Sequence, residues 1–91
     1  MTGRVEAIRD RLTEALAPVV LEVTDDSHLH AGHAGAAGGA GHFRLRIVSD
    51  RFAGLNRVAR HRLVYATLAP LMVSEIHALA IDARTPDEAQ A

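Results

Sequence analysis

The sequence predicts an α+β fold with the element order α-β-β-α-β, in which a three-stranded mixed sheet carries its helices on one face. Apolar residues repeat at helical spacing in two segments and alternate at strand spacing in three, in the chain order 2–17, 19–25, 42–48, 56–72 and 76–83. The first two strands can form a hairpin, and the second helix supplies the crossover that a parallel strand pair needs. Because 91 residues provide one small core, a single domain over residues 1–91 is expected.

The first helix is expected over residues 2–17, with Thr2 as its N-cap and Pro18 ending it. Its large apolar residues are three or four positions apart and share one face: Val5, Ile8, Leu12 and Leu16. Polar side chains fill the opposite face, so the helix is predicted to be amphipathic and to pack on the sheet.

Alternation assigns one face of each of the first two strands to the core. In the first strand, the side chains expected to point inward are Val19, Leu21 and Val23. In the second strand, the inward side chains are Phe43, Leu45 and Ile47, and the outward ones are Arg44 and Arg46. One face of the sheet is therefore expected to be exposed to solvent.

The connection between these strands, residues 31–41, contains five glycines and no large side chain. It has nothing to bury, and glycine gives its backbone wide conformational freedom. We predict a flexible Gly/Ala-rich hairpin loop, longer than most hairpin loops. Loops of this length in compact domains are usually functional or disordered.

The second helix is expected over residues 56–72, with Asn56 as its N-cap and Pro70 distorting or ending its last turn. The third strand follows over residues 76–83. The C-terminal tail, residues 85–91, opens with a threonine, a proline and two acidic residues, an order typical of a helix start. At most one helical turn is expected there.

The near-neutral charge and the lack of cysteine exclude several kinds of site. Ten basic and eleven acidic residues leave a formal net charge of −1, so any nucleic-acid surface must be a local patch. Without cysteine the chain forms no disulfide and offers no thiolate to a metal. Metal binding would therefore use histidine or the sulfur of a partner.

Two further classes are not expected from the motifs. The sequence has no phosphate-binding loop, no nucleophile elbow and no His-Glu-x-x-His motif, so no enzymatic activity is expected. No apolar run approaches the length that spans a bilayer, and the N-terminus lacks an apolar segment of secretory length. A cytoplasmic protein without membrane association is expected.

Histidine is the main chemical signal of the sequence. Of six histidines, four lie within fifteen residues around the loop: His28, His30, His33 and His42. Neutral imidazole is a common ligand of zinc, iron, copper and nickel, and a flexible loop lets ligands move toward a metal or a cofactor on another protein. A solvated loop without metal is the competing interpretation.

His77 opens the third strand, where alternation places it on the face of Leu79 and Ile81. A histidine at such a position is usually an edge-of-core residue. As a ligand, it would have to reach past the end of the core.

A basic group on the second helix is the candidate nucleic-acid surface, extended by two arginines of the second strand. Its residues are Arg57, Arg60, His61, Arg62, Arg44 and Arg46. A solvated helix face is the alternative. It is favoured by the lack of an aromatic stacking platform on the outward sheet face and of a Gly-x-x-Gly clamp.

Six segments resemble the BolA family, and the resemblance runs from the first helix to Thr85-Pro86. They are Leu21-Glu22-Val23, Asp25-Asp26-Ser27-His28-Leu29-His30, Gly41-His42-Phe43-Arg44-Leu45, Val48-Ser49-Asp50-Arg51-Phe52, Arg60-His61-Arg62-Leu63-Val64-Tyr65 and Ile76-His77-Ala78-Leu79-Ala80-Ile81. The combination of Arg-His-Arg with the later His-Ala-Leu is specific. The resemblance implies an α-β-β-α-β fold similar to class II KH domains.

The resemblance also implies two competing functions. In one, the protein pairs with a monothiol glutaredoxin and supplies two ligands to a [2Fe–2S] cluster, which it shares with the glutaredoxin cysteine and with glutathione. This partnership would serve iron–sulfur assembly, transfer or iron sensing. In the other, the helix bearing Arg-His-Arg binds DNA and the protein regulates transcription. No cofactor is expected on the isolated protein, which is expected to be a monomer or a weak dimer.

For cluster binding, the resemblance implies a histidine at the start of the last strand and a second ligand in the loop. These positions match His77 and His30, and His33 is an alternative loop ligand because it lies three residues further along the same loop. The lack of cysteine places the chain in the histidine-loop group. A third possibility is a small docking module in which metal binding is incidental.

Overall fold

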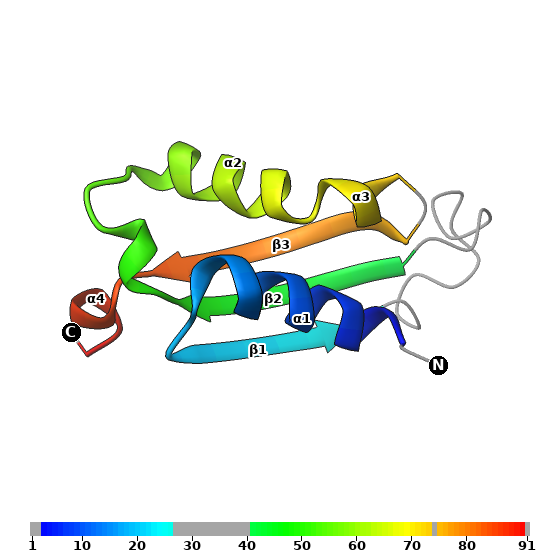
Figure 1. The fold of residues 1–91 in the computed structure, drawn as a ribbon, viewed down its shortest axis with the longest axis horizontal. Coiled ribbons are helices and arrows are strands. Elements are labelled where there is room, and N and C mark those ends of the chain that lie inside the picture. Colours follow the sequence, from blue (N-terminus) through cyan, green and yellow to red (C-terminus); the bar gives the residue numbers. More distant parts are fainter. Residues whose placement is uncertain (1–2, 27–40, 74, 91) are drawn as a thin grey trace.

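The computed structural model describes residues 3–26, 41–73 and 75–90, which form one sheet and the helices that cover it. Strands β1 (Val20–Asp25), β2 (Gly41–Val48) and β3 (Ile76–Arg84) lie in the order β1-β2-β3 (Figure 1). β1 pairs with β2 in the antiparallel direction, and β2 pairs with β3 in the parallel direction. The predicted α+β class with a three-stranded mixed sheet is confirmed.

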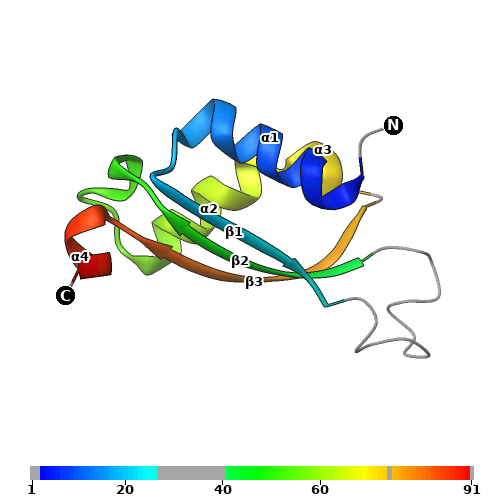
Figure 2. The same cartoon turned by 90° about the horizontal axis from the view of Figure 1, so that it is seen from below.

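Three helices cover the same face of the sheet, as Figure 2 shows: α1 (Arg4–Leu16), α2 (Arg57–Thr67) and α3 (Ala69–Met72). In the described ranges, the opposite face carries no helix. A 3₁₀ turn (Asp50–Phe52) follows β2, and a short helix, α4 (Pro86–Gln90), follows β3 (Figure 1). None of the described helices is both long and apolar enough to cross a membrane.

The core lies between the sheet and the helices, with β2 along its centre. The inward side chains of β2 are buried as predicted, and they are Phe43, Leu45 and Ile47. They pack with buried side chains of the helices and the 3₁₀ turn, namely Ile8, Leu12, Leu16, Phe52, Val64 and Leu68. Because alternate residues of a strand point to opposite faces, Arg44 and Arg46 lie on the exposed face, also as predicted.

Helix side chains reach the backbone of both outer strands of the sheet. Arg9 of α1 donates from Nη1 to the carbonyl of Leu21 in β1 at 3.0 Å. Tyr65 of α2 donates from Oη to the carbonyl of Leu79 in β3 at 3.4 Å. These bonds attach one helix to each edge of the sheet.

The first helix and the first strand are both shorter than predicted. α1 begins at Arg4 with Gly3 as its N-cap in extended geometry (φ −75°, ψ 170°), so the predicted Thr2 cap is wrong. β1 begins at Val20, and Val19, predicted to point inward, is 65% exposed. Strand alternation does not extend to Val19, because Ala17 turns the chain out of α1 with a φ of 44° before the strand begins.

The second helix starts as predicted but is interrupted before its expected end. Asn56 accepts a hydrogen bond at Oδ1 from the Ala59 amide at 2.9 Å, which confirms it as the N-cap. α2 ends at Thr67, Leu68 leaves helical geometry (φ −96°, ψ 5°), and α3 follows with Pro70 in its first turn. Proline has no amide donor and its ring clashes with the carbonyl four residues earlier, so it is tolerated at a helix start and not in the middle of a helix.

The ends of the predicted loop, strand and tail shift slightly. Gly41, expected to be the last residue of the loop, is buried as the first residue of β2, and residues 31–40 lie outside the described part of the chain. β3 extends to Arg84, one residue further than predicted. The short helix predicted in the tail is present as α4, and it follows a reciprocal pair of hydrogen bonds between Thr85 and Glu88.

We predict that Ser49→Ala lowers the free energy of unfolding by about 1–3 kcal/mol, because it leaves a buried carbonyl without its donor. The Ser49 side chain is fully buried, donates from Oγ to the Leu16 carbonyl at 2.6 Å and accepts from the Arg51 amide at 3.1 Å. Urea unfolding of both proteins measures the change. Thr13→Ala, which removes an exposed hydroxyl from α1, is the control and should change stability by less than about 0.5 kcal/mol. Equal effects of the two substitutions would contradict the role given to Ser49.

Candidate functional site

A bulge at the start of β3 determines where His77 lies. Gly41 of β2 is opposite Ile76 and the next residue, His42, is opposite Ala78, so His77 is the extra residue of β3. Ile76 is 3% exposed, whereas His77 is exposed. The bulge thus lets one residue enter the core while the next turns outward.

The predicted face of His77 is therefore wrong. Regular alternation would place it with Leu79 and Ile81, which do pack against the core. The extra residue breaks this alternation between Ile76 and Ala78. The side chain of His77 therefore lies outside the core. His77 therefore does not need to reach past the core to meet a metal.

His42 is the residue that the structure adds to the site. The His42 and His77 rings are 5.1 Å apart between centroids, with an angle of 52° between their planes. Alternation along β2 already placed His42 on the outward face with Arg44 and Arg46, but the partner of His42 depends on the β2–β3 register. Sequence spacing carries no signal for that register.

His28, His30 and His33 lie outside the described residues, but both ends of the segment that contains them are described. The Asp26 amide donates to the His42 carbonyl at 2.8 Å, and the Gly41 amide donates to the Glu75 carbonyl at 3.0 Å. Asp26 and Gly41, which flank the segment 27–40, therefore both lie at the end of the sheet that carries His42 and His77. We call the group Asp26, His42 and His77 the histidine end.

The histidine end offers two imidazoles within the described residues. In residues 3–26, 41–73 and 75–90 there is no group of three or more His, Asp or Glu side chains that could hold a metal. A metal or cluster at this end would therefore need further ligands, from water, from the remaining residues of the chain or from a partner. An exposed imidazole at a strand end suits such a shared site, because a ring nitrogen can be approached from solvent.

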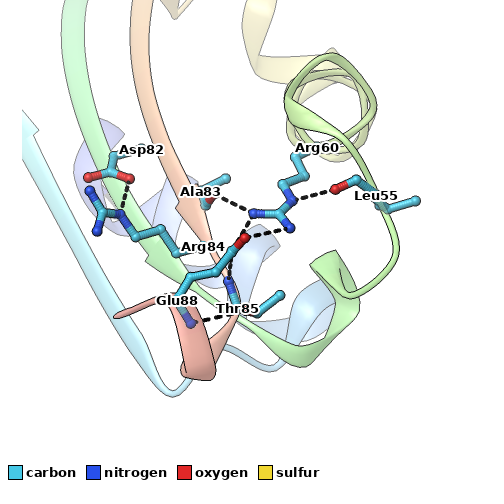
Figure 3. A network of polar contacts seen from close by, with 7 residues as sticks. All are labelled: Leu55, Arg60, Asp82, Ala83, Arg84, Thr85 and Glu88. Carbon is cyan, nitrogen blue, oxygen red and sulfur yellow. Dashed lines mark hydrogen bonds and ion pairs between the residues drawn. The ribbon is translucent and has the colours of Figure 1, made fainter. Parts of the chain in front are cut away.

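Arg60 lies at the opposite end of the sheet and is held by the fold. Its side chain is 13% exposed and makes four hydrogen bonds that join α2 to its preceding turn, to β3 and to α4 (Figure 3). Nε donates to the Leu55 carbonyl at 2.8 Å, and Nη1 donates to the Ala83 carbonyl at 3.2 Å. Nη1 and Nη2 donate to the two carboxylate oxygens of Glu88 at 2.5 and 3.2 Å. A phosphate would have to compete with these partners for the guanidinium group.

The contact with Arg60 lowers the pKa of the Glu88 carboxyl. The hydrogen bonds from Arg60 and from the Thr85 amide favour the carboxylate, and they lower the pKa of Glu88 from 4.5 to about 2. Arg84 forms a second ion pair close by, donating from Nε to Asp82 at 2.9 Å (Figure 3). We call the group Arg60, Asp82, Arg84 and Glu88 the arginine end.

The arginine end borders an open surface pocket of about 680 Å³ between α2, β3 and α4. Its ionisable lining comprises Arg57, Arg60, His61, Asp82, Arg84 and Glu88. Arg57 and Arg62 are exposed on α2, and His61 is half-buried. Three of the four helix residues predicted to bind nucleic acid therefore line one pocket, and the fourth is exposed on the same helix.

Arg44 and Arg46 do not join this basic group. Strand alternation places them on the exposed face of the sheet, where Arg44 pairs with the residue that follows β1 and Arg46 pairs with an acidic residue of β1. Arg44 is 3.0 Å from Asp26, and Arg46 is 3.6 Å from Glu22. The structure thus separates the predicted nucleic-acid-binding residues into two surfaces, because strand alternation directs these arginines away from the helices.

The fold and the sequence now identify the family. The chain matches the family model described as BolA-like protein over residues 12–88, and it belongs to the BolA family. It is 53% identical over 85 residues to human BolA-like protein 1, a match that covers 92% of this chain and 60% of the relative. It is 52% identical over 86 residues to the Arabidopsis thaliana protein named SufE-like protein 1, chloroplastic/mitochondrial, covering 89% of this chain and 23% of the relative.

Two further similarities are relevant to the site. The chain is 42% identical over 83 residues to the Escherichia coli protein named DNA-binding transcriptional regulator BolA, covering 91% of this chain and 76% of the relative. The solved BolA domain of SufE1 from Arabidopsis thaliana matches it with a TM-score of 0.85 and 48% identity, covering 97% of this chain and 98% of the domain. The chain spans 60% or less of the length of the human and Arabidopsis relatives. Because the Arabidopsis relative is named for organelles, the cytoplasmic location stays a prediction.

We predict that the Arg60–Glu88 pair stabilises the fold at neutral pH and that acid removes this stabilisation. The pKa of Glu88 is lower in the folded chain than in the unfolded chain, so the contribution is complete above about pH 4.5 and is lost as the pH falls toward 2. The difference in melting temperature between the unsubstituted chain and Glu88→Gln should therefore be largest above pH 5 and should shrink between pH 4.5 and 2. Asp87→Asn is the matched control in the same helix and leaves the pair in place. A difference that does not change with pH would contradict the assignment.

Proposed function

We propose that this chain pairs with a monothiol glutaredoxin and supplies two histidine ligands to a [2Fe–2S] cluster, as part of iron–sulfur assembly, transfer or iron sensing. Glutaredoxin cysteine and glutathione would supply the remaining ligands. Membership of the BolA family supports the proposal. The observation that carries it is the bulge that turns His77 out of the core at the histidine end.

The residues at the histidine end fit this role. The His77 imidazole is exposed on a hydrogen-bonded strand, so its ring nitrogen is accessible to a partner without unfolding of the core. The second ligand is His30, with His33 as the alternative, in the segment between Asp26 and Gly41, two residues that both lie at this end of the sheet. Histidine ligation at one iron raises the reduction potential of such a cluster relative to ligation by thiolates alone.

The shared arrangement suits the handling of a cluster as cargo. One histidine is held on a paired strand and the other belongs to a separate segment, so this chain alone provides half of the ligands. The complete set exists only in the complex with the partner. A site of this type favours transfer or sensing over permanent storage.

A second function, DNA binding, is favoured by one specific observation. Arg57 and Arg62 are exposed on α2, whereas Arg60 is held in an ion pair with Glu88. The Escherichia coli relative is named as a DNA-binding transcriptional regulator. With so few basic residues on this surface, binding would be weak, would consist mainly of phosphate contacts, and would lose affinity as salt is added.

The cluster proposal predicts that this chain changes the visible absorption and circular dichroism of a cluster-loaded monothiol glutaredoxin. His77→Ala should abolish the change, because it removes a ligand, and one of His30→Ala and His33→Ala should do the same and thereby identify the loop ligand. His61→Ala, a histidine substitution on α2, is the control and should leave the change intact. An unchanged spectrum with the unsubstituted chain would contradict the proposal. So would binding that persists with apo-glutaredoxin after both His30 and His77 are replaced, because it would indicate a docking module.

The DNA alternative predicts that Arg57→Ala and Arg62→Ala each weaken binding at low salt and each reduce the slope of log K against log salt concentration by about one. Fluorescence anisotropy with a labelled duplex measures both quantities. Arg11→Ala, which removes an exposed arginine of α1, is the control. Equal loss of binding for all three variants would show a bulk charge effect and would contradict a DNA surface on α2.

A further inference from the structure

We propose that His42 and His77 together form a binding site for a divalent transition-metal ion on the isolated chain, with Zn²⁺ as the ion to test. This inference goes beyond the proposed function, because it requires neither glutaredoxin nor the histidines of residues 27–40. It rests on the distance between two described imidazole rings, on the rigidity of the strands that hold them and on the charges around them.

The ring separation matches two imidazoles bound to one ion. A metal bonded to one nitrogen of each ring at about 2.0–2.1 Å would lie about 3.2 Å from each ring centroid. With the centroids 5.1 Å apart, the directions from the metal to the two rings would meet at about 105°, close to the tetrahedral angle of about 109° that zinc prefers. Binding would require side-chain rotations that direct one nitrogen of each ring toward a common point, at the ring spacing that the two strands set.

Both histidines stand on backbone that the sheet holds in place. His42 lies between two buried residues, Gly41 and Phe43, and its carbonyl accepts the Asp26 amide. His77 directly follows Ile76, which is 3% exposed and belongs to the core. Metal binding at such a site orders little besides the two side chains, so little conformational entropy is lost.

The charges near the pair permit a cation. Two arginines lie at this end of the sheet, and both form ion pairs: Arg44 with Asp26 at 3.0 Å and Arg4 with Glu75 at 2.8 Å. Their positive charges are therefore compensated by carboxylates. A divalent ion at the two imidazoles would therefore not face uncompensated guanidinium charge.

The chemistry of the donors restricts the class of ion. Imidazole nitrogen suits Zn²⁺, Cu²⁺ and Ni²⁺, whereas Mg²⁺ and Ca²⁺ prefer oxygen. Water would fill the remaining positions, since His77 is exposed. The expected order of affinity is Cu²⁺ above Zn²⁺, as the Irving–Williams series requires, with no binding of Mg²⁺ at comparable concentration.

Isothermal titration calorimetry with zinc chloride tests the site on the full chain. To separate the pair from the other histidines, the reference protein carries His28→Ala, His30→Ala and His33→Ala together. We expect this protein to bind one Zn²⁺ with an affinity within about threefold of that of the unsubstituted chain. Loss of a second-shell partner already weakens metal binding by about 10–100-fold, so adding His42→Ala or His77→Ala should weaken it by at least about tenfold. Adding His61→Ala, the control, should leave it unchanged.

A second measurement does not depend on the folding of the variants. In the unsubstituted chain, long-range ¹H–¹⁵N spectra of the imidazoles should show zinc-dependent shifts of the ring nitrogens of both His42 and His77, and none for His61. Zinc binding that disappears with His28, His30 and His33, or shifts confined to other histidines, would overturn the inference. A cluster spectrum with glutaredoxin that survives such a result would leave the proposed function standing, so the two failures are distinguishable.

Discussion

The parallel pairing of β2 with β3, with one extra residue in β3, is the constraint on which the rest of the structure depends. β2 is the central strand, so its register fixes which side chains of β3 join the core beneath the helices. The extra residue allows Ile76 and Leu79, three positions apart, both to pack against the core. Without it, either the first residue of the strand or the rest of its apolar face would be exposed, and His77 would not lie beside His42.

The paired strands β2 and β3 also separate the histidine end from the arginine end, which lie at opposite ends of the sheet. The histidine end brings two imidazole rings together, with 5.1 Å between their centroids. The arginine end includes Asp82 and Arg84, which lie five and seven residues beyond His77 along β3, and its guanidinium groups are engaged by backbone carbonyls and by carboxylates. A partner bound at one end therefore meets surfaces that are chemically unlike those at the other. Substitutions at the two ends can be used to distinguish the functions.

Local sequence patterns predicted most of the fold. Alternation in β2, the Asn56 cap and the effect of Pro70 are local properties, and each was confirmed because neighbouring residues determine it. The position of His77 could not be predicted in the same way, because a bulge depends on pairing with a strand far away in sequence. The role of Arg60 was missed for a related reason: its carboxylate partner, Glu88, is 28 residues away. The six segments that resemble the BolA family correctly indicated the family, but they did not indicate which side chains would meet.

The bonds from the helices to the outer strands also affect how this chain meets other chains. An exposed strand edge offers unpaired carbonyls to which another strand can add, which is a common route to aggregation. Here Arg9 donates to Leu21 on one edge, and Tyr65 and Arg60 donate to Leu79 and Ala83 on the other. An incoming strand would have to displace these side chains before it could pair. Strand addition at these edge positions is thereby disfavoured.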